Sequence, residues 1–299
     1  MLTLGLPALG LSLGCALAYS ASDYFRKAVP PDCPVALTLF YAFALEAPVI
    51  AVWLWVSGDV RLETAYALPG LAAAIVGLGA NFMFIVAVRR SPLSLMVPML
   101  GLIPVLTALI SGALLGEWPQ PHQAAGIVLV AAGLFTLYIP PDRKAGLGFS
   151  IGAVWRNLRN EPGAGPMAAV IVLWSIAPPV DKLCLAHASV GMHGLVQLFI
   201  LWGTIGLWLV ARGGFGALTP PRHAIKPLIG VALTAGLGYA MQLTAYRLTL
   251  VAIVEVFKRS VGLLGALVLG RIFFGEPITR PKVLGILIMA LGLPLVLMD

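Results

Sequence analysis

Residues 251–277 read VAIVEVFKRSVGLLGALVLGRIFFGEP. The stretch is long enough for one transmembrane helix, which needs about 20 mainly apolar residues, yet Glu255, Lys258 and Arg259 lie inside it. A charge near the bilayer centre costs about 2.5–3.5 kcal/mol on insertion scales, so we expect this helix to face a polar cavity or a protein partner. The spacing of three and four residues places all three side chains on one helical face, where the acid offsets one of the two bases.

Two interpretations of this charged face are open. The first is an anion site inside the membrane, because charges within spans usually mark functional sites. Arg259 would offer a planar fork and Lys258 a compact charge, and both suit phosphate or carboxylate groups. The second is an internal ion pair that only holds helices together. Neighbouring residues on a helix point about 100° apart, so one ligand need not contact both bases.

The composition is that of a polytopic membrane protein. Among 299 residues, 60% are hydrophobic and 10% are charged, and the mean hydropathy is +0.98, whereas a soluble domain carries roughly 25% charged residues. The net charge of +7 does not indicate nucleic acid, because the basic residues fall in short connections between apolar runs. Cys15, Cys33 and Cys184 lack the spacing of a disulfide framework or a metal site. We therefore expect membrane lipid around the chain, no nucleic-acid partner and no metal.

Apolar runs of span length predict about ten transmembrane helices and leave no room for a soluble catalytic domain. They lie at approximately residues 4–22, 35–57, 67–88, 92–115, 123–139, 166–185, 193–211, 225–247, 249–274 and 283–298. The longest connection, residues 141–165, carries basic residues around an apolar stretch at 149–158. This pattern predicts either a short helix lying at the membrane interface or a plain basic linker in the cytoplasm.

The chain repeats itself at a nearly constant spacing. A shift of 159 residues pairs Gly116-Glu117 with Gly275-Glu276, and the same shift pairs other positions along the two halves, namely Gly126 with Gly285, Ala131 with Ala290, and Gly133 with Gly292. A shift of 155 residues pairs Lys27 with Lys182 and Trp53 with Trp208. We therefore predict two copies of a five-helix unit, residues 1–140 and 166–299, joined by the linker.

Because five is odd, the second copy must enter the membrane in the opposite orientation. The basic residues test this expectation independently. Fourteen of the 19 Lys and Arg residues lie in one alternate set of connections, two lie inside a span, and the opposite set holds three, Arg61, Lys182 and Arg247. The positive-inside rule then predicts a bacterial inner-membrane protein with both termini in the periplasm. Inverted repeats are typical of secondary transporters, whose substrate site lies at mid-membrane between the halves.

Lys182 follows Pro178 and Pro179 at the end of the sixth run. Two prolines remove hydrogen bonds from the helix ladder, so we expect the span to break there and its freed carbonyls to line a cavity. Lys182 is then either a second cationic contact for the substrate or a loop charge paired with Asp181.

Further polar and aromatic residues within the spans are candidates for the same site. Gln242, Tyr246 and Thr249 recur at spacings of four and three and so form one polar stripe on the eighth span. The stripe either binds substrate or forms hydrogen bonds between helices. Asn81 is a polar group at similar depth in the third span, and Trp174 either walls the cavity or serves packing. Glu46 either carries a coupling proton, if burial keeps it protonated, or pairs with a base on another span.

The two five-span copies, each ending in a Gly-Glu turn followed by a Gly-rich span, resemble the drug/metabolite transporter superfamily of the EamA type. That resemblance implies a ten-helix fold with a central substrate cavity and no cofactor. Lys258-Arg259 in the ninth span and Lys182 near the end of the sixth are also similar to cationic residues of the plastid triose-phosphate/phosphate translocators. In those relatives the cations hold the substrate phosphate, which implies an anion-binding role for all three here.

We therefore predict a secondary active transporter, an exporter or exchanger, that moves a small anionic organic metabolite by alternating access. Its substrate-binding residues would be those already named (Lys258, Arg259, Lys182, Gln242, Tyr246, Asn81 and Trp174), with Glu255 and Glu46 as coupling or ion-pair residues. The alternatives are transport of amino acids or of neutral or hydrophobic metabolites, and translocation of an anionic lipid. An intramembrane enzyme is disfavoured because the four histidines fall near span ends and no HExxH motif occurs.

Overall fold

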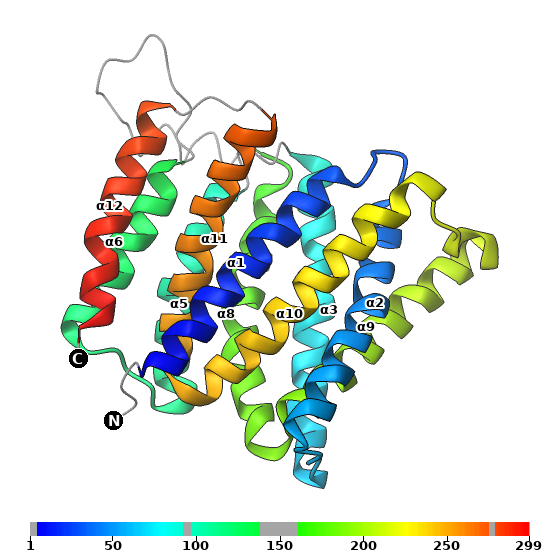
Figure 1. The fold of residues 1–299 in the computed structure, drawn as a ribbon, viewed down its shortest axis with the longest axis horizontal. Helices are drawn as coiled ribbons and strands as arrows, with labels where there is room; N and C mark the ends of the chain where they lie inside the picture. The colour runs from blue at the N-terminus through cyan, green and yellow to red at the C-terminus, as the bar shows by residue number, and fades with distance from the viewer. Residues whose placement is uncertain (1–4, 92–96, 138–160, 275–278, 299) are drawn as a thin grey trace. The chain divides into compact units, whose positions relative to one another are not determined.

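The computed structural model describes residues 5–91, 97–137, 161–274 and 279–298. Within these ranges the chain forms α-helices and short 3₁₀ helices, with no strand beyond an isolated bridge between Leu62 and Ala188 (Figure 1). In chain order the elements are α1 (Leu6–Ala28), α2 (Val35–Ser57), η1 (Thr64–Tyr66), α3 (Ala67–Arg90), η2 (Val97–Leu102), α5 (Ile103–Leu115), α6 (Pro121–Leu137), α8 (Ala164–His187), α9 (Val190–Gly213), η3 (Phe215–Leu218), η4 (Arg222–Ala224), α10 (Ile225–Leu248), α11 (Val251–Phe274) and α12 (Arg280–Leu297).

Each predicted apolar run coincides with a helix. The bounds of α2 are those predicted from the sequence, whereas the fourth run begins with the 3₁₀ helix η2 before α5 starts. Six helical segments of the described chain are long and apolar enough to cross a membrane. The protein is therefore an all-helical membrane protein. Most of the predicted linker, its interfacial helix and the Gly275-Glu276 turn lie outside the described residues.

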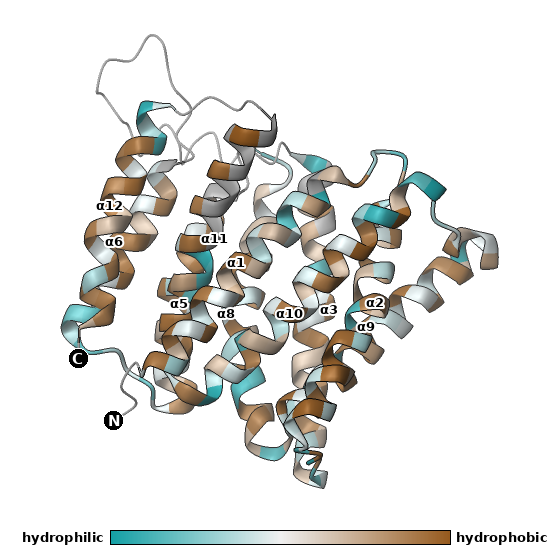
Figure 2. Ribbon diagram, in the orientation of Figure 1, coloured by the Kyte–Doolittle hydropathy of each residue, from teal (hydrophilic) through white to brown (hydrophobic). Residues whose placement is uncertain are grey.

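The surface and the interior have the polarity expected of a chain in lipid. Large apolar side chains point outward, and Trp55, Leu68 and Leu207 expose at least 75% of their surface. Glu255 and His193, by contrast, are fully buried. Figure 2 shows hydrophobic residues along most of each helix and hydrophilic residues gathered mainly at the ends. Contiguous exposed apolar surface of this kind marks contact with a membrane or a partner.

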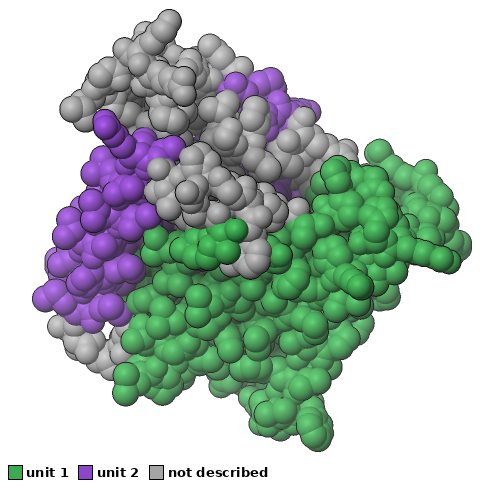
Figure 3. Space-filling view, turned by 45° about the horizontal axis from the view of Figure 1, so that its top comes forward, with its two compact units in different colours: residues 1–75, 180–275 green, residues 76–179, 276–299 purple. Residues whose placement is uncertain are grey.

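The helices gather into two compact units, each drawing on both halves of the chain (Figure 3). Unit 1 comprises residues 1–75 and 180–275, and unit 2 comprises residues 76–179 and 276–299. This is a different division from the predicted repeats, which stay a prediction.

In unit 1, α1 packs along α10 and α11, and α2 packs against α9 and α10. The contact between α2 and α9 is antiparallel, because Gly194 lies against Ile50 whereas the later Gly206 lies against the earlier Phe40. These two helices are equivalent under the repeat spacing of 155 residues.

In unit 2, α6 packs closely along α12. A Cβ atom at Gly126 would lie 2.7 Å from the carbonyl oxygen of Gly292, and one at Gly133 would lie 2.7 Å from that of Gly285. Only glycines allow the two backbones this approach. The reversed order of the contacts makes the pair antiparallel, and the four glycines are those related by the repeat spacing of 159 residues.

The expected break at Pro178 and Pro179 is wrong. Helix α8 continues through both prolines to His187. A proline lacks the N–H that would bond four residues back, so Pro179 leaves the carbonyl oxygen of Ser175 without its intrahelical donor. The hydroxyl of Thr107 on α5 donates to this oxygen at 3.4 Å, which is one way that membrane helices tolerate internal proline.

Candidate functional site

The cation pair lies on α11, in the part of unit 1 that packs against α1 and α10. Residues 251–257 are buried, and the side chain of Glu255 is 0% exposed. One helical turn further, the side chains of Lys258 and Arg259 are 16% and 25% exposed. The acid is therefore sealed inside the unit, while both bases keep part of their surface accessible.

Glu255 is held between two helices. The Tyr246 hydroxyl on α10 donates a 2.7 Å hydrogen bond to one carboxylate oxygen, and the Lys258 ammonium forms an ion pair with the same oxygen. The other oxygen lies 3.9 Å from Nε of Arg259. The predicted sharing of one acid by two bases is therefore present, and the three charges leave a formal excess of one positive charge.

The ammonium of Lys258 has two further neighbours. It donates to Oε1 of Gln242 on α10 at 3.2 Å, and it lies 5.8 Å from the centroid of the Tyr19 ring on α1. A cation over an aromatic face at this distance is attracted by the ring quadrupole. Gln242 and Tyr246, four residues apart, thus contact the same ion pair, so the polar face predicted for this helix is present.

Lys182 approaches the same region from α8. Its ammonium donates to the carbonyl oxygen of Thr249 at 2.8 Å, in the turn between α10 and α11. The alternative of a loop charge paired with Asp181 is wrong, because both residues lie within the helix and Asp181 instead contacts His193. The sequence analysis did not anticipate the fully buried Thr249 as the link between Lys182 and α11.

Glu46 on α2 is 5% exposed. Among the residues that the structure describes, none supplies its carboxyl with a hydrogen bond or an ion pair, so the expected basic partner is not found there. The prediction of a coupling proton on Glu46 stays a prediction.

Asn81 and Trp174 belong to unit 2. The Asn81 amide donates to the carbonyl of Gly77 in its own helix at 2.8 Å. The Trp174 ring packs against Phe84, with ring centroids 5.2 Å apart, at the edge of a core formed by α3, η2, α5 and α8. The contacts described for both residues are structural, and their predicted role in binding is untested.

A second buried polar group in unit 1 was missed by the sequence analysis. The Nδ1 atom of His193 lies 2.9 Å from the Tyr66 hydroxyl, and its Nε2 atom lies 3.3 Å from an Asp181 oxygen. The amide of Gln197 donates to the Tyr66 oxygen and to the Gly70 carbonyl, both at 3.0 Å. We call Asp181, His193, Tyr66 and Gln197 the polar relay. A sequence signal existed, since His193 and Gln197 stand four residues apart in an apolar run.

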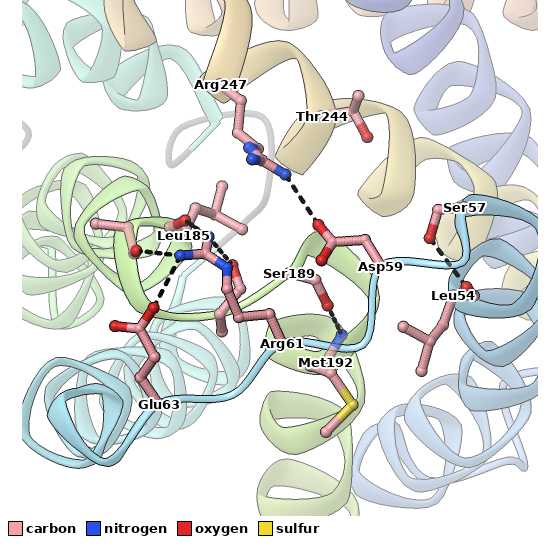
Figure 4. A network of polar contacts seen from close by, with 12 residues as sticks. Leu54, Ser57, Asp59, Arg61, Glu63, Leu185, Ser189, Met192, Thr244 and Arg247 are labelled. Atoms are coloured by element: carbon pink, nitrogen blue, oxygen red, sulfur yellow. Dashed lines mark hydrogen bonds and ion pairs between the residues drawn. The ribbon is translucent and has the colours of Figure 1, made fainter.

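A third polar group lies at the end of α8 (Figure 4). The Arg61 guanidinium donates to the carbonyls of Leu185, Ala186 and Ala188 at 3.2, 2.8 and 3.4 Å, and to Glu63 at 3.0 Å. Hydrogen bonds from His187 and Arg61 hold the pKa of the Glu63 carboxyl below its usual value. One arginine thus caps the last carbonyls of the helix, which otherwise lack partners.

The described residues contain no group of three or more His, Cys, Asp or Glu side chains placed to hold a metal ion. The α10–α11 face offers hydrogen-bonding groups and positive charge.

Comparison with known proteins gives the class. The model of the EamA-like transporter family matches residues 6–139, which confirms the resemblance to the drug/metabolite transporter superfamily. The match covers slightly less than half of the chain and is consistent with a membrane transporter of the drug/metabolite kind. No curated protein matches the chain.

Solved structures share the fold, and 28 of their chains match. One of them, titled only "Crystal structure of protein", has a TM-score of 0.74 to this chain at 18% identity. The similarity covers 96% of this chain and 95% of the other. At this identity it shows the fold alone.

Proposed function

We propose that the protein is a secondary active transporter of a small anionic organic metabolite, with Lys258 and Arg259 as the residues that bind the anion. The observation that carries the proposal is the asymmetry of the charged cluster. Glu255 is fully buried and contacts Tyr246, Lys258 and Arg259, while both bases remain partly accessible. An anion that reached them would meet a net positive charge and a planar fork suited to phosphate or carboxylate.

Lys182, Gln242 and Tyr246 would complete the binding face from α8 and α10. Asn81 and Trp174 stay proposed as substrate-binding residues. Lys182 already donates to the Thr249 carbonyl, and Gln242 already accepts from Lys258. The face therefore has a hydrogen-bond network that a substrate could enter by exchanging partners, without burying a new unpaired charge.

We further propose ten transmembrane helices in two inverted five-helix repeats that work by alternating access. Two pairs of helices that the repeat spacing makes equivalent, α2 with α9 and α6 with α12, each pack antiparallel. Repeats of one orientation would carry equivalent helices in the same direction. The antiparallel packing of both pairs supports inversion, and the asymmetry of Lys and Arg supports a bacterial inner-membrane protein with periplasmic termini.

The test is uptake into proteoliposomes from a panel of phosphorylated, carboxylated, neutral and cationic metabolites. We expect an anion to be the best substrate and its uptake to fall at least about tenfold in Lys258→Ala and Arg259→Ala. Arg259→Lys keeps the charge but loses the fork, so it should raise KM more than it lowers the maximal rate. Lys226→Ala, at an exposed lysine of α10, is the matched control and should transport like the wild type.

Transport of only cationic or apolar compounds, indifferent to both alanine variants, would overturn the anion assignment. If both variants lose thermal stability but keep the wild-type KM, the cluster is an internal ion pair and the proposal fails. A lipid-flipping assay in the same vesicles, with a fluorescent anionic lipid, identifies the outcome in which the substrate is a lipid headgroup.

A further inference from the structure

The polar relay has a defined direction of hydrogen bonding. The Gln197 amide donates to the Tyr66 oxygen, so the Tyr66 hydroxyl is free to donate its own hydrogen to Nδ1 of His193, 2.9 Å away. An Nδ1 atom that accepts carries no proton, and the neutral ring then holds its hydrogen on Nε2, directed at Asp181. The geometry therefore selects one neutral tautomer of His193, stabilised from both sides.

The relay is also enclosed. His193 is 0% exposed, Gln197 4% and Tyr66 6%, and the Asp181 side chain is 14% exposed. A carboxylate and an imidazole within hydrogen-bond distance of each other can share one added proton. Asp181 is the most accessible member of the relay.

Proton uptake would change the hydrogen bonding in a definite way. The added proton converts the ring into an imidazolium that donates from both nitrogens, with the Asp181 carboxylate as its counter-ion. The Tyr66 hydroxyl must then turn from donor to acceptor at Nδ1. The pair thus has two hydrogen-bonded arrangements that differ by one proton and one hydroxyl rotation.

The relay is adjacent to the anion site through two connections. Lys182, next to Asp181 on α8, donates to the Thr249 carbonyl in the turn that begins α11. Asp181 also acts electrostatically on Tyr246, the residue that donates to Glu255. Asp181 acts electrostatically on two further titratable groups near the relay, Cys184 on α8 and Tyr239 on α10. A proton gained at the relay therefore adds positive charge close to the groups that position Lys258.

We propose that the Asp181–His193 pair is the proton-binding site of this transporter, and that a proton taken up there from one side of the membrane accompanies the anion and is released to water on the other side. The proposal rests on the proposed function, since it names the coupling ion of that anion transporter. It assigns coupling to the relay and not to Glu46. The His193 ring has hydrogen-bond partners at both nitrogens, Tyr66 and Asp181, whereas Glu46 has no hydrogen-bond partner among the described residues.

The experiment uses the full-length protein in proteoliposomes, with the best anion of the metabolite panel in radiolabelled form as the probe. Two readouts are compared: counterflow at equal pH, which needs no coupling, and accumulation driven by an imposed pH gradient. In His193→Gln and Asp181→Asn we expect counterflow within about twofold of the wild type and loss of at least fivefold in gradient-driven accumulation, the lower end of ordinary coupling between sites. His223→Gln, at an exposed histidine beside Asp32, is the control.

Tyr66→Phe keeps the ring that packs against His193 and removes only the hydroxyl, so it tests the relay if the other variants fold poorly. It should weaken gradient-driven accumulation without abolishing counterflow. Nitrogen-15 NMR of labelled histidine, with His193 assigned by its loss in His193→Gln, should show the Nε2–H tautomer at neutral pH and a protonated ring at lower pH.

The outcomes separate the two proposals. No anion counterflow in the wild type refutes the proposed function. Normal counterflow combined with full gradient-driven accumulation in His193→Gln refutes the proton site, as does a His193 ring that keeps one protonation state from about pH 5 to 8. Equal loss of both readouts shows a merely structural relay, and uncoupling by Glu46→Gln alone transfers the role to Glu46; either result overturns the inference.

Discussion

The hydrogen bond between Tyr246 and Glu255 should be among the strongest single polar contacts in unit 1. Both side chains are fully buried, and the hydroxyl lies 2.7 Å from the carboxylate oxygen. A hydrogen bond to a charged group contributes about 1.5–3 kcal/mol, and Tyr246→Phe removes it without opening a cavity because the ring stays. We therefore expect the free energy of unfolding to fall by about 1.5–3 kcal/mol, roughly a 10- to 150-fold change in the unfolding equilibrium.

The assay is reversible unfolding in mixed micelles by titration with dodecyl sulfate, followed by tryptophan fluorescence. Tyr239→Phe is the matched control, because that hydroxyl on the same helix has no hydrogen bond among the described residues, and it should change the free energy by less than about 0.5 kcal/mol. A double-mutant cycle with Glu255→Gln should give a coupling energy of about 0.5–3 kcal/mol. Equal destabilisation by the two tyrosine variants, or strictly additive effects in the cycle, would show that the reasoning about this contact is wrong.

Three further predictions concern other parts of the fold. Because the pKa of Glu63 is lowered, its contribution to stability is fully present above its ordinary pKa of 4.5 and is lost as the pH falls through the folded value. Glu63→Gln should therefore remove that part of the acid sensitivity in a pH series of thermal melts. Gly126→Ala places a methyl group 2.7 Å from a backbone oxygen of α12 and should lower the free energy of unfolding by about 1–3 kcal/mol. Gly203→Ala is the control, because a Cβ atom there has nothing within 4 Å, and it should be neutral or stabilising in the dodecyl sulfate titration. Thr107→Val removes the donor to the Ser175 carbonyl and should lower the free energy of unfolding by about 0.5–1.5 kcal/mol. A variant as stable as the wild type would show that this carbonyl needs no partner.

The helical fold was predictable because hydropathy alone separates spans from connections in a chain of this kind. The run at 35–57 became α2 with the same bounds. The error at Pro178 and Pro179 has a clear origin. The sequence records the two missing N–H donors but not the Thr107 hydroxyl that satisfies a freed carbonyl from another helix, and such a contact depends on packing.

The candidate site was predictable only where its residues are close in sequence. Helical spacing placed Glu255 beside Lys258 and grouped Gln242 with Tyr246, since contacts three or four residues apart follow from the helix itself. The polar relay joins Tyr66 to His193 across 127 residues. No local pattern specifies a contact of that separation, although His193 and Gln197 stand four residues apart in an apolar run.

The close contact between α6 and α12 has a consequence for biosynthesis. The two helices lie 143 residues apart in the chain, from Leu137 to Arg280, and synthesis at about 5–20 residues per second separates them by roughly 7–30 s. During that interval the glycine face of α6 has no α12 to pack against and must be covered by lipid or by the insertion machinery. Unit 2 can therefore mature only after nearly all of unit 1 has been made, and slow delivery of α12 should leave a nascent chain open to faulty helix pairing and degradation.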